Sequence, residues 1–347
     1  MISHKLKIGV GFKTLLGLSV TFWVPFLVLA ITLYFFFQAP LQHALNQRVH
    51  SELLASIQIM QERPMRAQAA LIQLASQQEV IDAMIQQDTT SFQRLFNQYS
   101  HRYSFTTLLL SVNTSRTVIA RRNNRSGDQI EIGEMLARTL LLGEPQQNIE
   151  LLSRDFLSKE NEEFKSFFWD LALVQVFTTP VLSKGKVIGA LVGGIILSDD
   201  PWVSNAIHNR IGVEMAIFAG NPAESSILHS TSSLPRNIWK IRQSLPSEAS
   251  KSLELGRTYT GLVNIEDKQV TTSYELLKDS RQRIIGVIGV SSSDTNVSSI
   301  IQNNIFHSML IAASIGLFIA LLGGCPIMTN LLRKSGYWPD SHPIIVK

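Results

Sequence analysis

The chain has 347 residues, of which 45% are hydrophobic and 17% are charged, and its net charge is +4 at pH 7. Its 31 lysines and arginines are spread along the sequence rather than gathered in a patch, which excludes nucleic acid as a partner. The single cysteine, Cys325, excludes an intramolecular disulfide. A folded domain of this chain must therefore be held together by an apolar core.

Two uncharged apolar runs lie near the ends of the chain, at residues 14–37 and 308–328. Each is long enough to cross the roughly 30 Å hydrocarbon layer of a membrane as a helix. The alternatives are a cleaved signal peptide for the first run and a buried core helix for the second. Lysines precede the first run and basic residues follow the second, so the positive-inside rule predicts that both ends are cytoplasmic.

The segment that follows the first run, residues 38–104, is predicted to be a long helical stalk. Apolar residues recur at spacings of three and four from Leu41 to Ile85, which is typical of an amphipathic helix. Pro64 interrupts the pattern and is expected to kink or break the helix after Arg63. The apolar stripe fits two alternatives equally well, pairing with its copy in a homodimer or packing on its own domain.

Strand patterns begin after Phe105. Residues 106–121 alternate around an NTSR turn, which predicts a β-hairpin, and a short helix is expected over residues 134–143. Two strands are predicted to flank the turn SKGK at residues 183–186. The apolar run at residues 187–197 has only 11 residues, so it is expected to be a buried strand rather than a membrane span.

The pattern then starts again after a short helix predicted over residues 199–212, with Asp199 or Asp200 as its N-cap. Further strands are expected within residues 213–232, 255–277 and 283–293. The stretches that begin at Gln175 and Gln269 are similar, since both pass through a threonine-rich strand and a basic turn into a glycine-containing strand. This similarity predicts two related modules in tandem, each an antiparallel sheet covered by helices.

One ordered string resembles a known family. TTPVLSKGKVIGALVGGIILSDDPWVSNAIHNRIGVEMAIF, followed by LHSTS and GRTYTGLV, is similar to the extracytoplasmic double Cache sensor domains found ahead of bacterial kinases, cyclases and chemoreceptors. The likeness covers residues 41–300. It implies two PAS-like modules stacked on a long N-terminal helix, a dimer, and a small ligand held most often by the membrane-distal module.

The expected fold class is therefore α+β, with two transmembrane helices flanking a long N-terminal helix and two tandem PAS-like modules. The expected segments are a cytoplasmic N-terminus (1–13), a first transmembrane helix (14–37), a helical stalk (38–104), a membrane-distal module (105–198), a membrane-proximal module (199–300), a second transmembrane helix (308–328) and a short cytoplasmic tail (329–347).

Motifs for catalysis or metal binding are not found. The histidines do not fall at metal-ligand spacings, and the sequence contains no HExxH, CxxC or G-x-S-x-G string. The string GALVGG lies within a predicted strand, whereas a dinucleotide fingerprint lies between a strand and a helix. We therefore expect a protein without enzymatic activity, cofactor or metal.

Ligand-binding residues are expected near the sheet of the distal module. Arg121 and Arg122 could offer a cation to a carboxylate ligand. Gln175, Phe177 and Thr179 alternate along one strand and so share a face. Phe177 as a core residue and Arg122 as a solvated charge are the alternatives. An amino-acid ligand is not supported, because FKSFFWD lacks the arginine typical of amino-acid-binding Cache domains. The candidates are Arg121, Arg122, Trp169, Asp170, Gln175, Phe177 and Thr179.

The predicted function is ligand sensing for signal transduction, by a two-pass protein of the bacterial inner membrane with residues 38–307 outside the cytoplasm. Only 19 residues follow Met328, and they carry no relay or output motif, so we expect a truncated receptor or one that depends on a separate cytoplasmic signalling protein. The other expected partners are a small-molecule ligand, the membrane and a second copy of the chain. The alternative is an envelope structural or adaptor protein whose modules bind another protein.

Overall fold

The structure is a computed structural model. It describes residues 10–122, 126–130, 132–166, 170–198, 200–220, 229–232, 245–265, 268–292, 307 and 314. The ten described strands all lie within one compact unit, Leu45–Ser293.

The N-terminal part of the fold consists of the helices α1 (Val10–Ala75), α2 (Gln78–Gln86) and α3 (Thr89–Arg102). Helix α1 continues through Pro64, so of the two predicted effects a break after Arg63 is wrong, and a kink stays a prediction. A proline in a helix leaves the carbonyl four residues earlier without its helical donor, and in this protein the Gln175 side chain donates to that carbonyl, which belongs to Met60. The helix instead ends at Ala75, and α2 begins at Gln78, after two intervening residues.

The first module is built on a five-stranded antiparallel sheet with the strand order β2-β1-β5-β4-β3. The predicted hairpin, the predicted helix that ends before Gly143 and the predicted strands around SKGK are confirmed. Its elements are β1 (Leu108–Asn113), β2 (Val118–Arg121), α4 (Gly133–Leu142), β3 (Gln146–Ser153), α5 (Arg154–Ser158), the 3-10 helix η1 (Glu162–Ser166), β4 (Leu171–Ser183) and β5 (Lys186–Ile196).

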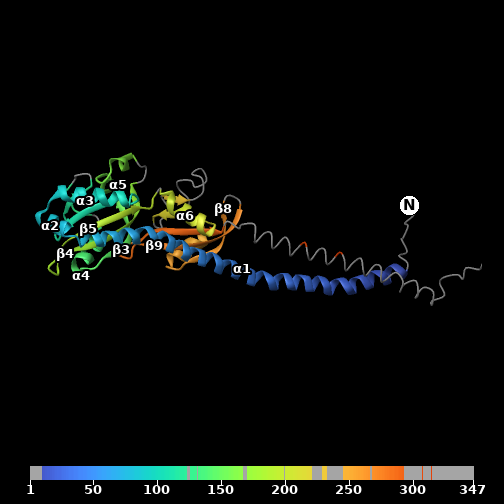
Figure 1. The fold of residues 1–347 in the computed structure, drawn as a ribbon. Coiled ribbons are helices and arrows are strands. Elements are labelled where there is room, and N and C mark those ends of the chain that lie inside the picture. The colour runs from blue at the N-terminus through green and yellow to red at the C-terminus, as the bar shows by residue number, and fades with distance from the viewer. Residues whose placement is uncertain are drawn as a thin grey trace, which may run out of the picture. The chain divides into compact units, whose positions relative to one another are not determined.

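Apolar cores cover both faces of this sheet. On one face Phe177 packs with Leu71 of α1 and Phe92 of α3. On the other face Leu110 packs with residues of α4 and α5, among them Leu136 and Phe156. Successive side chains of a strand point to opposite faces of the sheet, so neighbouring residues pack in different cores. Figure 1 shows the helices around the sheet.

The second module repeats this topology. Its sheet order, β7-β6-β10-β9-β8, becomes the order of the first sheet when the strands are renumbered from the start of the module, so the prediction of two related modules is confirmed. Asp200 caps α6 by accepting from the backbone N–H of Trp202. The elements are α6 (Pro201–Ile211), β6 (Val213–Ala219), β7 (His229–Ser232), α7 (Ser247–Glu254), β8 (Tyr259–Ile265), β9 (Lys268–Lys278) and β10 (Ile284–Ser292).

The two modules are joined by direct contacts. Leu173 of β4 belongs to the core of the second module, where a Cβ added at Gly286 would lie 3.3 Å from its Cδ1 atom. Leu53 and Met60 of α1 belong to the same core. Helix α1 therefore packs against both sheets (Figure 1).

In the described part of the chain, none of the helices combines the length and the apolar character that crossing a membrane requires. Apart from Ser314, the predicted span at residues 308–328 lies outside the described residues, as do most side chains of residues 14–37. Both spans stay predictions from the sequence.

Candidate functional site

Arg121 lies buried at the end of β2, between two carboxylates. Its Nε donates a hydrogen bond to Glu160, and its Nη1 donates to Asp128 at 2.6 Å. The Nζ of Lys159 donates to the same aspartate at 2.9 Å. Burial raises the pKa of Glu160 to about 7, against the opposing effect of the Arg121 charge. The charge of Arg121 is therefore balanced by acids of the module itself, although the sequence suggested that this residue could bind the carboxylate of a ligand.

Gln175, Phe177 and Thr179 share the face of β4 that meets the N-terminal helices. Phe177 lies across Gly193, its partner on β5, so closely that a Cβ added at Gly193 would overlap the ring. Gln175 Nε2 donates to the backbone carbonyl of Met60 in α1 at 3.3 Å. The Thr179 hydroxyl is buried and has no hydrogen-bond partner in the described structure. Two of these three side chains thus contact the core and the helix that cover the sheet.

The other predicted residues lie apart from this group. Asp170 is exposed and pairs with Arg154 at 3.0 Å. Arg122 follows the end of β2 and is half-buried. Trp169 lies outside the described residues. The structure therefore brings three of the seven candidates together on β4 and places Arg121 in a separate cluster beside Phe156, on the other side of the sheet.

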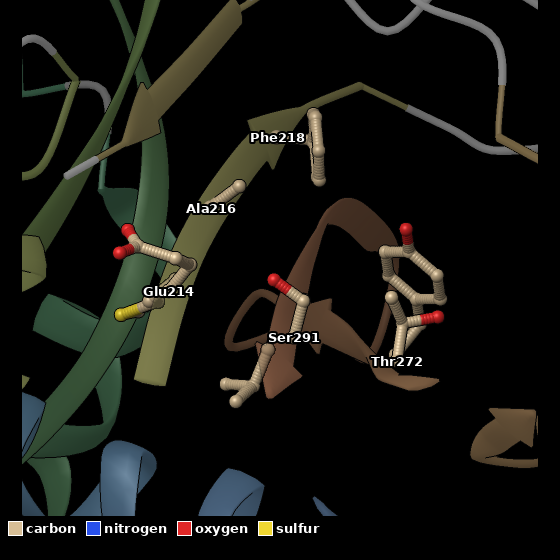
Figure 2. A pocket seen from close by; sticks show the side chains of 9 residues that line it. Glu214, Ala216, Phe218, Thr272 and Ser291 are labelled. Atoms are coloured by element: carbon tan, nitrogen blue, oxygen red, sulfur yellow. The ribbon is translucent and has the colours of Figure 1, made fainter. Parts of the chain in front are cut away.

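A shallow hollow lies on the second sheet, where residues of β6, β9 and β10 surround a space of about 10 Å³, which is room for about one water molecule. Figure 2 shows the labelled side chains projecting from these strands around it, with the Glu214 carboxylate at the edge and turned outward. The side chains that define the hollow belong to Glu214, Ala216, Phe218, Thr272, Tyr274 and Ser291.

Small residues on neighbouring strands open this hollow. Gly289 of β10 lies between Ala216 of β6 and Tyr274 of β9 in the strand register. The Tyr274 ring extends over this glycine, and a Cβ added there would come within 2.5 Å of the ring. Tyr274 is held from its other side by Tyr259, whose ring is stacked on it with the centroids 6.3 Å apart. The floor of the hollow is therefore backbone, and one wall is aromatic.

The polar groups of the hollow are hydroxyls and one acid. Thr272 is only 1% exposed, and its side chain lies close enough to Tyr274 to hydrogen-bond to that phenol. Burial raises the pKa of Tyr274 to about 12, so its phenol is neutral at physiological pH. Glu214 is the only charged residue of the lining, and its Oε1 lies 2.9 Å from Nδ1 of His208. The Thr272 hydroxyl thus lies beside Tyr274, and the Glu214 carboxylate beside His208, within the module itself.

Sequence reasoning missed this hollow. Period-two alternation does place Thr272 with Tyr274, and Glu214 with Ala216 and Phe218. It does not show which glycine of the GVIGV string lies beneath the tyrosine, because that depends on the register between strands distant in sequence.

Residues 42–296 match the family described as the double sensory domain of two-component sensor kinase, and the chain belongs to this double Cache family. No curated protein matches the sequence. The chain is similar to the sensor domain of the histidine kinase DctB from Vibrio cholerae, with 13% identity, a TM-score of 0.44 and coverage of 72% of this chain and 97% of that one. For the sensory domain of the Campylobacter jejuni chemoreceptor Tlp3 the identity is 11%, the TM-score is 0.45 and the coverage is 75% and 98%.

Proposed function

We propose that the protein is an inner-membrane receptor whose residues 38–307 lie outside the cytoplasm and bind a small molecule. The observation that carries this proposal is the tandem arrangement of two sheets with one strand order, joined along a single helix, in a chain of the double sensory domain family. The two uncharged apolar runs support the membrane anchors. We assign residues 105–198 to the membrane-distal module and residues 199–300 to the membrane-proximal one.

Signalling in this proposal passes through α1 and β10. One turn of α1 contacts both modules, since the Met60 carbonyl accepts from Gln175 of β4 and the Arg63 guanidinium lies 3.4 Å from the ring centroid of Trp202 in α6. Strand β10 is the last described strand and lines the hollow. A ligand that binds one arrangement of the modules more tightly shifts the population towards it, and both elements would carry this change towards the predicted spans.

A homodimer is part of the same proposal. Leu54, Met65 and Ile72 of α1 are 52%, 57% and 41% exposed, although each is a large apolar residue. They are 11 and 7 residues apart, which corresponds to about three and two helical turns, so they form one line along the helix. A second copy of α1 would bury this line, as in the interfaces of paired helices.

Reporter fusions test the membrane anchors. Alkaline phosphatase, which is active only outside the cytoplasm, should be active when fused after Gln38 and inactive when fused after Lys347. An active fusion at Lys347 would contradict the two-span arrangement.

Ligand sensing is tested by thermal unfolding of the full-length protein in detergent with a broad metabolite panel. A metabolite that raises the unfolding temperature is expected. No shift, together with a stable complex with an envelope protein, would favour an adaptor function instead.

A further inference from the structure

We propose that Glu150 of the first module and the β9–β10 turn of the second, residues 279–283, form a latch between the two modules that is closed by protons. Such a latch goes beyond the proposed ligand sensing, because it adds a response to pH and requires no organic ligand. It is carried by a hydrogen bond from the turn to a carboxyl group that is buried where the two modules meet.

The hydrogen bond joins an edge of one sheet to a hairpin of the other. The backbone N–H of Ser280 donates to Oε1 of Glu150 across 3.1 Å. Glu150 lies on β3, the last strand in the order of the first sheet, and is only 7% exposed. Ser280 lies in the turn between β9 and β10, which are neighbours in the second sheet. The contact therefore reaches the strand β10 directly from the first module.

Apolar contacts flank this hydrogen bond. Leu277 and Ile285, at the two ends of the turn, lie in a core that also contains residues of α1 and β4. Ile149 and Leu151, the neighbours of Glu150 on β3, pack against the same core. The carboxyl group is thus a polar point in a mostly apolar contact, where loss of hydration penalises its charge.

The turn is held in shape by its own hydrogen bonds. The Gln282 N–H donates to the carbonyl of Asp279 at 2.9 Å, which makes Ser280 the second residue of a β-turn. The buried Asp279 carboxylate accepts from the backbone N–H groups two and four residues further on, both at 2.9 Å, and from the Arg283 guanidinium. The turn is therefore ordered by these bonds, while the Ser280 N–H is donated outside it, to Glu150.

The surroundings of Glu150 disfavour its ionised form. Burial raises the pKa of Glu150, and the negative charge of Asp279 adds to this effect, whereas hydrogen bonds from Ser280 and the charge of Arg283 oppose it. Arg283 is mostly exposed and is already paired with Asp279 at 2.6 Å, so it neutralises Glu150 only weakly.

The other elements that pack on β3 add few charges near this contact. Strand β4 carries none. The charged residues of the remaining elements are Glu134 and Arg138 of α4, which pair with each other, Arg154 of α5, which pairs with Asp170, the exposed Asp155 of α5, and Glu275, Lys278 and Arg281 in the end of β9 and its turn. The charged residues that shift the pKa of Glu150 are Asp279 and Arg283, both in the turn.

Protons should therefore close the latch. When the turn leaves β3, the Glu150 carboxyl meets water and its pKa returns towards 4.5. The docked state binds the proton more tightly, so docking is favoured below about pH 4.5 and weakens as the pH rises through the raised pKa of the docked state. The protonated carboxyl still offers a carbonyl oxygen to the Ser280 N–H.

Hydrogen–deuterium exchange of the full-length protein in detergent tests this latch. Glu150→Gln keeps an oxygen acceptor but cannot titrate, so its latch should stay closed at every pH. In peptides that cover residues 278–284, the exchange rate of the wild type relative to this variant should rise about 3- to 10-fold between pH 5 and pH 8. Comparing both proteins at the same pH cancels the intrinsic effect of pH on exchange. Glu144→Gln, at an exposed acid just before β3, is the matched control and should leave the relative rate constant.

A second pair of variants acts on the donor. Ser280→Pro removes the N–H, and proline is favoured at the second position of a β-turn, so the turn should persist. This variant should keep the latch open at any pH. In peptides that cover residues 146–153, the wild type should therefore exchange more slowly than Ser280→Pro at pH 5, and the difference should shrink at pH 8. Ser280→Ala keeps the N–H and should stay within about twofold of the wild type at pH 5.

The possible results are distinct. A relative rate of the wild type and Glu150→Gln that is equal at pH 5 and pH 8 would overturn the latch, as would a wild type that becomes better protected than the variant at the higher pH. Equal exchange of Ser280→Pro and Ser280→Ala at pH 5 would show that the turn does not hold β3. If Glu150→Gln does not fold, which circular dichroism shows, the pH dependence of the wild type against Ser280→Pro decides. Ligand sensing is tested separately by the metabolite panel, so either proposal can fail alone.

Discussion

The side-chain amide of Gln175 in β4 donates a hydrogen bond to the backbone carbonyl of Met60 in α1, across 3.3 Å. Met60 precedes Pro64 by four residues, so its carbonyl is the one that the proline deprives of a helical donor. Both residues are buried, at 3% and 2% exposure. The sheet of the first module thus compensates the proline from outside the helix, which allows α1 to continue to Ala75.

Replacing Gln175 should therefore weaken the fold through the helix. Gln175→Met keeps the size of the side chain but leaves the Met60 carbonyl without its donor, and we expect the free energy of unfolding to fall by about 1–3 kcal/mol in urea. Pro64→Ala restores a backbone N–H at residue 64. In the double variant the loss should therefore be smaller by about 1 kcal/mol than the sum of the single effects.

The control for this cycle is Thr179→Val on the same face of β4, where no hydrogen bond is lost among the described residues. Its free energy of unfolding should stay within about 0.5 kcal/mol of the wild type. Strictly additive effects of Gln175→Met and Pro64→Ala would show that the two residues are independent.

The same pair shows where prediction from the sequence stops. Local rules predict hairpins and caps well: Lys184 and Gly185 adopt the left-handed φ of 49° and 76° that a tight turn needs, and Asp200 caps α6. The effect of Pro64 cannot be predicted in this way, because the compensating amide lies 115 residues further along the chain from Met60. Propensity describes an isolated helix, and tertiary contacts override it.

The candidate site shows a similar limit. Alternation predicts that Gln175 and Phe177 point to one side of β4, but not that helices cover that side. Arg121 ends a strand as expected, and its pairing with Glu160 depends on the path of the chain after α5. Strand β3 was not predicted, because its first residues, QQN, lack an apolar alternation.

Gly193→Ala should destabilise the first module. A Cβ at residue 193 would overlap the ring of Phe177, which is fully buried and cannot move aside without disturbing the core. We expect a loss of about 1–3 kcal/mol in urea unfolding. Phe177→Leu provides space for the added methyl group, so the loss in the double variant should be smaller than the sum of the two single losses.

Gly133→Ala is the matched control for this substitution, since its Cβ would lie 4.0 Å from the nearest atom and residue 133 begins a helix. It should be neutral or slightly stabilising. Equal losses at residues 133 and 193 would mean that the contact with Phe177 is not the cause.

Glu160 should make stability depend on pH. Burial raises the pKa of its carboxyl to about 7 in the folded protein, above the ordinary value of 4.5. Between these two values the folded state binds more protons than the unfolded state, so stability falls as the pH rises from about 4.5 to about 7. Glu160→Gln removes this contribution.

Urea unfolding at several pH values measures the effect as the difference between the wild type and Glu160→Gln. This difference should change by roughly 1–3 kcal/mol across the window, to the disadvantage of the wild type at the higher pH. Glu162→Gln, at an exposed acid two residues further on, should show no comparable change. A wild type that gains stability over the variant with rising pH would show that Arg121 dominates and that the pKa is lowered.

Disulfide cross-linking tests the exposed line on α1. Because Cys325 is the only cysteine, Cys325→Ser gives a background without thiols. Met65→Cys and Ile72→Cys should then form cross-linked dimers on oxidation, since two copies of the line would face each other at short distance. Arg66→Cys is the control, because this side chain is also exposed but lies about 100° around the helix from Met65. Equal cross-linking at residues 65 and 66 would indicate random collision. No cross-linking at residue 65 or 72 would show that a second copy of α1 does not pack along this line. Strong cross-linking at residues 65 and 72, without cross-linking at residue 66, requires that the two helices meet on this face.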